Sequence, residues 1–258
     1  MLVLLPPSAG KAEGGDGPPL DLGALSFAAE LGRLRARILR NLAKASARRD
    51  ALRRLDAPAG AADQVRANVT LAQAPTLAAA QRYTGVLYDA LGLATLDADA
   101  QEWAERSVVI VSALFGALRP QDRIPAYRLA MGVDLAGVGP LASAWRRPLG
   151  TALAAAAGDG LVVDCRSAPY VAAWPAPRGP RVERFVAVRV LREEAGKRTV
   201  VSHMAKQTRG AIVRTLLESG ADPQTPRQLA DVVSAKWRVE LAEPDRAGTA
   251  WRLDVIDG

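Results

Sequence analysis

The chain has 258 residues, 49% hydrophobic and 24% charged, which excludes a disordered chain and allows a sizeable core. Its net charge of +7 favours nucleic acid, phosphorylated ligands or an anionic surface as partners, with a merely basic, solvated surface as the equal alternative. One cysteine, Cys165, and one histidine, His203, exclude an internal disulfide and the usual Cys/His zinc site.

The expected setting is cytoplasmic, without a membrane partner. The single cysteine favours a reducing compartment. The apolar run Met1–Leu5 meets Pro6 and Pro7 at once, so it is too short for a signal peptide, and no apolar run approaches the ~18 residues of a membrane span. We also expect no metal and no cofactor.

In the first half of the chain, residues 2–5 form a short apolar run that two prolines end, which predicts a buried first strand. Residues 8–19 are rich in Gly and Pro and predict a loop. Helical spacing of apolar residues predicts a long basic amphipathic helix over 25–55, whose basic residues are best explained as a solvated face. Two helices and a central strand are then expected over 76–91, 97–106 and 107–111.

In the second half, a loop over 120–128 precedes a helix over 141–157, which Pro148 kinks or restarts. A strand is expected over 161–164, and a hairpin pairs 182–190 with 199–203 through the turn 194–197. Helices over 206–218 and 226–233 and strands at 237–241 and 250–255 follow. No repeat or long linker divides the chain, so residues 1–258 are expected to form one compact α/β domain with a mixed sheet flanked by helices.

Two loops carry residues suited to chemistry. Ser8, Ala9, Gly10 and Lys11 follow the first strand, and open α/β sheets bind ligands at such carboxyl ends. Lys11 could hold a phosphate or, when desolvated, serve as a base or imine-forming amine; the alternative is a solvated loop lysine. The loop also shows Ser-x-x-Lys, a frequent chance pattern, and lacks the P-loop spacing.

The second loop follows the strand at 107–111 and contains arginines between two prolines. Prolines fix the shape of a loop, so Arg119, Arg123 and Arg128 could be held toward an anion together with Tyr127. The alternative is a structural pair between Arg119 and Asp122 that pins the loop.

The run Leu114–Gly132 resembles the core signature of the YaaA family, with Gly-x-Leu-Arg-Pro-x-Asp followed by Pro-x-Tyr-Arg-Leu. Further matches follow in family order over about 200 residues: Pro6-Pro7-Ser8-x-Gly10-Lys11, Tyr83–Tyr88, Trp145, Ser167-x-x-Tyr170 and Ala205-Lys206-x-x-Arg209-Gly210. The chain departs from the pattern at Ala130, where an acidic or small polar residue is common. If an acidic residue at this position is catalytic in relatives, this chain lacks it.

The resemblance implies a family-specific α/β fold with a positively charged cleft and a helix-hairpin-helix-like element. It also implies binding of double-stranded or branched DNA, a role in peroxide stress, and limitation of iron-driven damage. Our candidate hairpin joins the helices at 206–218 and 226–233 through residues 219–222, with Lys206, Arg209 and Arg214 on phosphates. A second candidate runs from 83–92 into the helix at Asp97, and an ordinary helical hairpin is the alternative for both.

Two functions therefore stay open. The first is a DNA-binding protein of the peroxide stress response. The second is an enzyme that acts on a nucleobase, a nucleotide or a DNA lesion, with Lys11 as its key residue. Its cleft would be lined by Ser8, Lys11, Arg119, Tyr127, Arg128, Ser167 and Tyr170. A basic scaffold for protein partners is a third reading.

Overall fold

The structure, a computed structural model, describes residues 1–177, 179–194, 197–199, 202–244 and 249–257. The strands of its main sheet are β1 Leu2–Leu5, β4 Val108–Ser112, β5 Gly116–Leu118, β9 Val162–Asp164, β10 Phe185–Glu194, β11 Lys197–Thr199, β12 Arg238–Ala242 and β13 Trp251–Asp257. They lie in the order β12-β13-β10-β9-β1-β4-β5, with β11 on β10. The neighbours from β13 to β4 in this order are parallel, whereas β5, β11 and β12 pair antiparallel. The mixed sheet confirms the expected α/β class.

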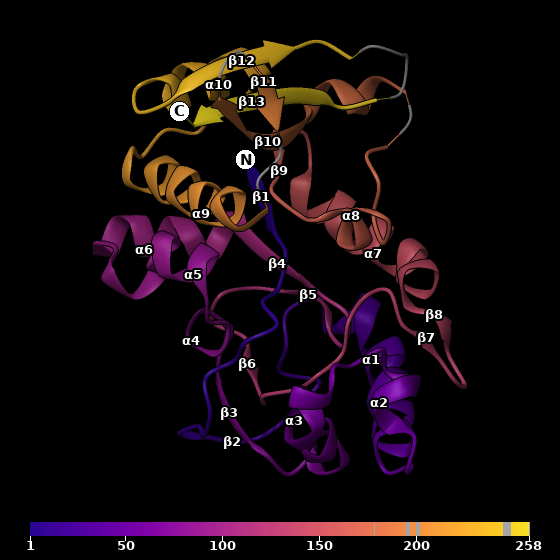
Figure 1. Ribbon diagram of the computed structural model, residues 1–258. Coiled ribbons are helices and arrows are strands. Elements are labelled where there is room, and N and C mark those ends of the chain that lie inside the picture. The colour runs from indigo at the N-terminus through magenta and orange to yellow at the C-terminus, as the bar shows by residue number, and fades with distance from the viewer. Residues whose placement is uncertain (178, 195–196, 200–201, 245–248, 258) are drawn as a thin grey trace.

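Helices flank this sheet on both sides. They are α1 Ala28–Ser46, α2 Ala51–Arg54, α3 Ala62–Ala67, α4 Ala79–Arg82, α5 Val86–Leu91, α6 Ala98–Ser107, α7 Leu141–Ala157, α8 Ala168–Val171, α9 Ser202–Glu218 and α10 Pro226–Ser234. Figure 1 shows α5, α6 and α9 on one side of β1 and β4, with α7 and α8 on the other. Among the described helices, none combines the length and the apolar character needed to cross a bilayer.

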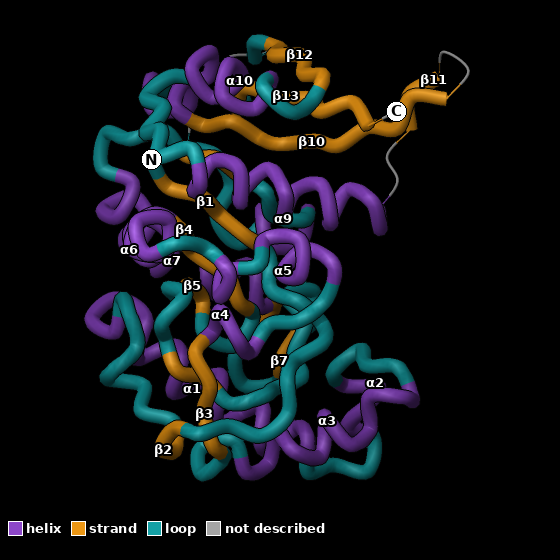
Figure 2. Tube along the Cα trace, turned by 90° about the vertical axis from the view of Figure 1, so that its left-hand side faces the viewer, coloured by secondary structure: helices purple, strands orange, loops and turns teal. Residues whose placement is uncertain are grey.

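Two small sheets lie apart from the main one. One contains β2 Gly17–Pro19, β3 Pro75–Ala78 and β6 Arg123–Ile124, and the other is the hairpin of β7 Asp134–Leu135 and β8 Gly139–Pro140. Figure 2 shows β2, β3 and α1 to α3 at the end of the molecule opposite β12 and α10.

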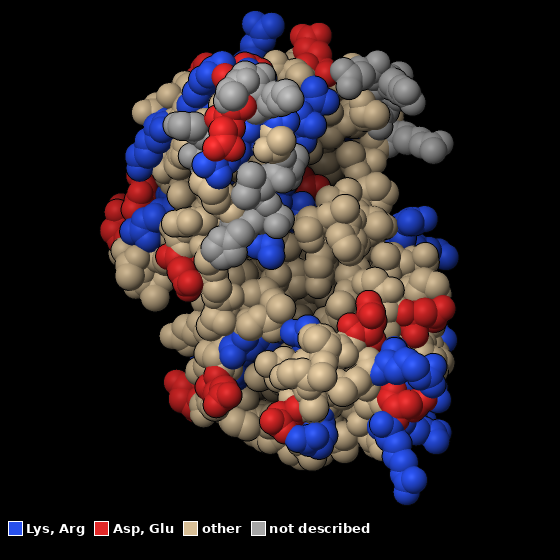
Figure 3. Space-filling view, viewed as in Figure 1, with Lys and Arg blue, Asp and Glu red and all other residues tan. Residues whose placement is uncertain are grey.

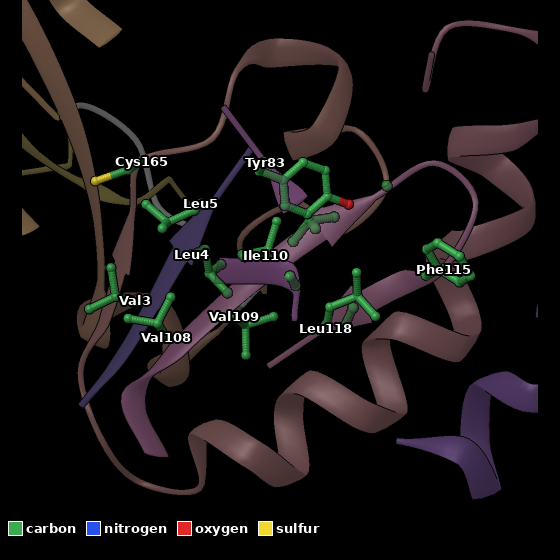
Figure 4. Packing of buried hydrophobic residues seen from close by; sticks show 14 of the residues in the cluster. Val3, Leu4, Leu5, Tyr83, Val108, Val109, Ile110, Phe115, Leu118 and Cys165 are labelled. Carbon is green, nitrogen blue, oxygen red and sulfur yellow. The ribbon is translucent and has the colours of Figure 1, made fainter. Parts of the chain in front are cut away.

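The first strand, β1, forms the centre of the core. All four of its residues are buried, and it pairs on one side with β4 and on the other with β9. A strand covered on both faces has to be apolar throughout, which is why this run does not alternate with polar residues. Figure 4 shows β1 and β4 side by side with their aliphatic side chains packed around them.

The expected helix over 25–55 is two helices, because α1 ends at Ser46 and α2 begins at Ala51. Its basic face is not wholly solvated. Arg35 is fully buried and donates hydrogen bonds to the carbonyl oxygens of Phe115, just before β5, of Ala117 in β5, and of Ser26. Arg35 therefore anchors α1 to the edge of the sheet.

The helix expected over 76–91 is confirmed only in part. Residues 75–78 form β3, which pairs with β2 and β6, and the helical part is split into α4 and α5. Gly85 separates the two helices with a φ of 104°, a conformation that breaks a helix and that L side chains rarely adopt. Apolar spacing alone did not reveal this break.

The hairpin expected over 182–199 is partly confirmed. A short 3₁₀ helix occupies Pro180–Arg184, and β10 then pairs antiparallel with β11. Residues 195–196 and 200–201 lie outside the described residues. The strand expected over 199–203 is wrong at its end, because α9 already begins at Ser202.

Other expectations are confirmed. The Asp97 side chain caps α6 by accepting from the Ala100 amide at 2.8 Å. The helix α7 continues through Pro148. The last two helices and the last two strands lie where the pattern predicts them.

Candidate functional site

The candidate site lies where three neighbouring parallel strands end. β9, β1 and β4 run in the same direction, so the loops that follow them leave the sheet at one edge. Lys11 lies in the loop after β1 and Tyr170 lies after β9. The segment after β6 brings Tyr127 and Arg128 to the end of β4, where the Tyr127 hydroxyl contacts Ser112. The carboxyl edge of a parallel sheet is a common place for ligand binding in α/β proteins.

Lys11 is held in a largely desolvated position. Its Nζ lies 4.2 Å from the centre of the Tyr127 ring and 5.5 Å from that of Tyr83, and it donates to the Ser8 carbonyl oxygen at 3.1 Å. Burial, together with the positive charges of Arg128 and Arg82, lowers the pKa of Lys11 to about 7. The amine is thus unprotonated in a large fraction of molecules near neutral pH, unlike an exposed lysine.

All four tyrosines of the chain lie close to one another, and two of them, Tyr83 and Tyr127, face the Lys11 amine. The Tyr127 hydroxyl contacts that of Tyr83 at 2.9 Å and the Ser112 hydroxyl at 2.7 Å, and Ser112 in turn accepts from the Phe115 amide. Tyr88 stacks on Tyr83 and donates to the Pro6 carbonyl oxygen at 2.7 Å. Figure 4 shows the Tyr83 hydroxyl directed toward the carboxyl end of β4.

Burial raises the pKa of Tyr83, Tyr88 and Tyr127 well above the usual value. These hydroxyls therefore stay protonated, and they shape the site without acting as bases.

Arg128 lies beside Lys11 with its guanidinium available. Asn68, which is fully buried, clamps the Arg128 backbone: its side chain accepts from the Arg128 amide and donates to the Arg128 carbonyl, each at 2.9 Å. The guanidinium itself makes no hydrogen bond or ion pair with any described residue. An unpaired cation beside a neutral amine is suited to hold the anionic group of a ligand.

Tyr170 and Ser8 belong to the same surroundings. Burial raises the pKa of Tyr170 to about 12, against the opposite effects of a Met131 backbone hydrogen bond and of Arg128. The Ser8 hydroxyl accepts from the Thr84 amide at 3.2 Å and donates to the Gly10 carbonyl oxygen at 2.5 Å. Lys11 contacts the carbonyl oxygen of Ser8, so the two side chains of the Ser-x-x-Lys pattern do not pair.

The structure does not bring Arg119 to this cluster. Its guanidinium donates to the carbonyl oxygen of Val108, the first residue of β4, and lies 5.5 Å from the Phe27 ring. Ser112, which contacts Tyr127, is the last residue of the same strand, about 13 Å away at ~3.3 Å per residue. Because β5 runs antiparallel to β4, Arg119 lies at the opposite end of these strands from Ser112.

The alternative role of Arg119 fits better. Asp122 accepts from the backbone amide of Arg119 at 2.8 Å, and from both the amide and the hydroxyl of Ser26, so it pins this loop. Ser167 precedes α8, and no hydrogen bond links its hydroxyl to Lys11 within the described part of the chain.

Patterns in the sequence did not identify four further members of the site, which are Arg82, Tyr83, Tyr88 and Ser112. Arg82 is fully buried and donates to the carbonyl oxygens of Ala12, Gly14, Pro75 and Ile124, which binds the Lys11 loop to α4. No local pattern marks such an arginine. For Tyr83 and Tyr88 a signal existed, since both lie in a segment that matches the family.

The proposed DNA-binding residues on α9 differ in their availability. Lys206 is exposed. Arg209 donates to the Val188 carbonyl oxygen at 3.1 Å. Arg214 is used internally, because it donates to the Leu91 and Gly92 carbonyl oxygens and to Thr95 and pairs with Glu218.

The turn that follows α9 is also poorly suited to phosphate. Asp222 lies in it, and its carboxylate accepts from the amino group of Met1 at 2.9 Å. A carboxylate at this place repels a DNA backbone. The second candidate hairpin, from α5 through Gly92 to α6, is capped by Asp97 and tied to α9 by Arg214.

The described residues contain no group of three or more His, Cys, Asp or Glu side chains that could hold a metal ion. Cys165 is fully buried after β9, and burial raises the pKa of its thiol to about 12. This thiol is therefore not a nucleophile near neutral pH.

Comparison with known proteins shows the family of the chain. Residues 1–243 match the family described as peroxide stress protein YaaA. A UPF0246 protein of Streptomyces coelicolor is 46% identical over 99% of this chain and 98% of its own length. UPF0246 proteins of Corynebacterium efficiens and Cereibacter sphaeroides are 39% and 35% identical, over 94% and 72% of this chain and 96% and 74% of their own lengths. The chain belongs to the family of the peroxide stress protein YaaA.

Proposed function

We propose that this protein acts on oxidatively damaged nucleotide units of DNA during peroxide stress, with Lys11 as the reacting amine. The observation that carries this proposal is the Lys11 amine, whose pKa is lowered to about 7 by burial and by Arg128 and Arg82. The family description supplies the setting of peroxide stress. Catalysis by a lysine amine requires the neutral form, and this environment favours it.

The chemistry follows from the neutral amine. Its lone pair adds to an electrophilic carbon, such as the aldehyde carbon of an opened abasic sugar. The carbonyl oxygen then takes up protons and leaves as water, and an imine links Nζ to the sugar. Arg128 would hold the neighbouring phosphate, and the half-exposed Tyr170 offers a ring beside it.

Borohydride trapping on a duplex that contains an abasic site tests this function. Borohydride reduces an imine to a stable amine, so the unaltered protein should give a covalent adduct. Lys11→Ala and Lys11→Arg should both abolish it, because arginine keeps its proton at any accessible pH. Lys236→Ala, which removes an exposed lysine outside the proposed DNA-binding residues, is the matched control and should trap normally. An arginine variant that traps as well as the unaltered protein would refute the proposal.

A second candidate is DNA binding without chemistry, which the net charge of +7 and the exposed Lys206 favour. Log affinity for a duplex should then fall with log salt, with a slope near −0.9 for each phosphate contact. Lys206→Gln should make this slope shallower by about 0.9 if α9 contacts the DNA backbone. Lys236→Gln removes another exposed lysine and should leave it unchanged. A flat salt response, or no binding at ~50 mM salt, would contradict DNA binding.

We propose further that any limitation of iron-driven damage is indirect. The chain has one histidine and one cysteine, so it is poorly supplied with ligands for iron. Protection of the DNA itself would lower the damage that iron causes without any iron on the protein. Added iron should then leave the intrinsic fluorescence and the unfolding midpoint unchanged, and a saturable shift would contradict this.

A further inference from the structure

A second basic site lies between α1, α2 and the hairpin of β7 and β8. It is a pocket of about 340 Å³, lined by Asn41, Lys44, Ala45, Arg48, Arg54 and residues 134–137. Figure 3 shows Lys and Arg side chains gathered at the lower right of the molecule, over the region of α1 and α2 in Figure 1. The proposed function uses none of these residues.

The positive charges of this pocket are not balanced within the protein. Neither Lys44 nor Arg48 makes an ion pair or a side-chain hydrogen bond with any residue that the structure describes. Arg54 is paired with Asp50 at 2.7 Å, and Asp134 is the acidic residue of the lining. Lys44 and Arg48 both line the pocket, so two cations border one space.

A structural role explains only part of this arrangement. Lys44 lies in the last turn of α1, where a cation is stabilised by the helix dipole by about 0.3–1 kcal/mol. Arg48 lies two residues beyond the helix end, where the same dipole also favours a cation. Both cations also border a concave space, which a dipole effect does not require.

The walls of the pocket are fixed before any ligand arrives. The Arg37 guanidinium donates to the Gly137 carbonyl oxygen at 2.8 Å, and Asn41 donates to the Arg37 carbonyl oxygen at 2.8 Å. Gly137 has a φ of 81°, and a Cβ there would come within 2.4 Å of the Asn41 Oδ1 atom. Only glycine allows this approach, so the hairpin turn is held against α1.

We propose that this pocket binds a small phosphorylated sugar. Lys44 and Arg48 would take the phosphate, whose oxygens can accept from both. The pocket is at the lower end of the usual range for small ligands, roughly 300–1,000 Å³, so a lone phosphate would leave most of it empty. Asp134 and Asn41 supply acceptors for sugar hydroxyls, and Asp134 would weaken the binding of a lone phosphate.

Calorimetric titration of the full chain with ribose 5-phosphate tests the site. Saturable binding is expected, at least tenfold tighter than for inorganic phosphate. The double variant Lys44→Gln with Arg48→Gln should weaken it at least tenfold. Arg33→Gln with Arg40→Gln is the matched control, because it removes two exposed charges from the same helix outside the pocket. It should change the affinity less than twofold.

A second variant separates a sugar phosphate from a lone anion. Asp134→Ala should weaken ribose 5-phosphate at least threefold, yet tighten inorganic phosphate, because it removes both carboxylate acceptors and a repelling charge together. Equal weakening by the two double variants, equal affinity for both probes, or no saturable binding would overturn the proposal. So would a short duplex that competes for the pocket at lower concentration than ribose 5-phosphate, since that outcome assigns the cations to DNA backbone.

Discussion

Lys11 links the stability of the fold to pH. Its pKa in the folded chain is about 7, whereas an unfolded lysine has a value near 10.4. Between these values the unfolded state binds the proton and the folded state does not, so the unfolding free energy rises with pH. The slope from Lys11 is at most ~1.4 kcal/mol per pH unit. Below pH 7 both states are protonated and the slope vanishes.

Lys11→Met removes this dependence. Urea unfolding at pH 7, 8 and 9 should find the variant more stable than the unaltered protein by a margin that shrinks as the pH rises. Lys206→Met, at an exposed position, is the control and should differ from the unaltered protein by a constant amount. A constant margin for Lys11→Met as well would mean that burial does not perturb this amine.

Residue types and their order in the sequence predicted part of the surroundings of Lys11. The place of Lys11 after a buried strand made it a candidate, because strand ends of this kind meet at one edge. The buried Arg82 and Asn68 could not be found in this way. Each acts by bonding the backbone of a distant segment, Arg82 to the Lys11 loop and Asn68 to Arg128, and such bonds leave no local pattern.

At the scale of elements, α5 and α9 approach each other closely at Gly210. A Cβ on this residue would lie 2.1 Å from the Leu87 carbonyl oxygen, so the two helices would have to separate. Gly210→Ala should therefore destabilise the fold by roughly 1–3 kcal/mol, although alanine favours a helix by about 1 kcal/mol over glycine.

The matched control is Gly150→Ala in α7. No atom lies within 4 Å of a Cβ added there, so alanine should stabilise the protein by up to about 1 kcal/mol. Urea unfolding of both variants measures the difference. If both changes had the same sign, helix propensity rather than the contact between α5 and α9 would decide stability.

Elements with a distinct apolar pattern could be predicted, and short strands without one could not. The helices α6, α7 and α10 and the strands β1 and β4 follow from apolar spacing, capping and β-branched runs. The strands β2, β3 and β5 to β8 have two to four residues each, too few to show a period. Arg119 was misplaced for this reason, since the short return strand β5 decides to which edge it goes.

At the scale of the whole molecule, strand order explains why distant segments form one site. Lys11 and Tyr170 are about 160 residues apart, yet β1 and β9 are direct neighbours in the sheet. With β4 on the other side of β1, three loops meet over the same edge. The sequence suggested this convergence through its motifs, but only the strand order gives it a physical cause.

The central claim is that the Lys11 amine is neutral in a large fraction of molecules near neutral pH. NMR titration of the lysine side-chain carbon signals, with Lys11→Arg used to assign the Lys11 signal, measures its pKa directly. Our account predicts a midpoint near pH 7, and a partial rise toward the ordinary value in Arg128→Gln, because that change removes one of the three causes that lower the pKa. A Lys11 midpoint near 10.4, the value of an exposed lysine, would contradict the account.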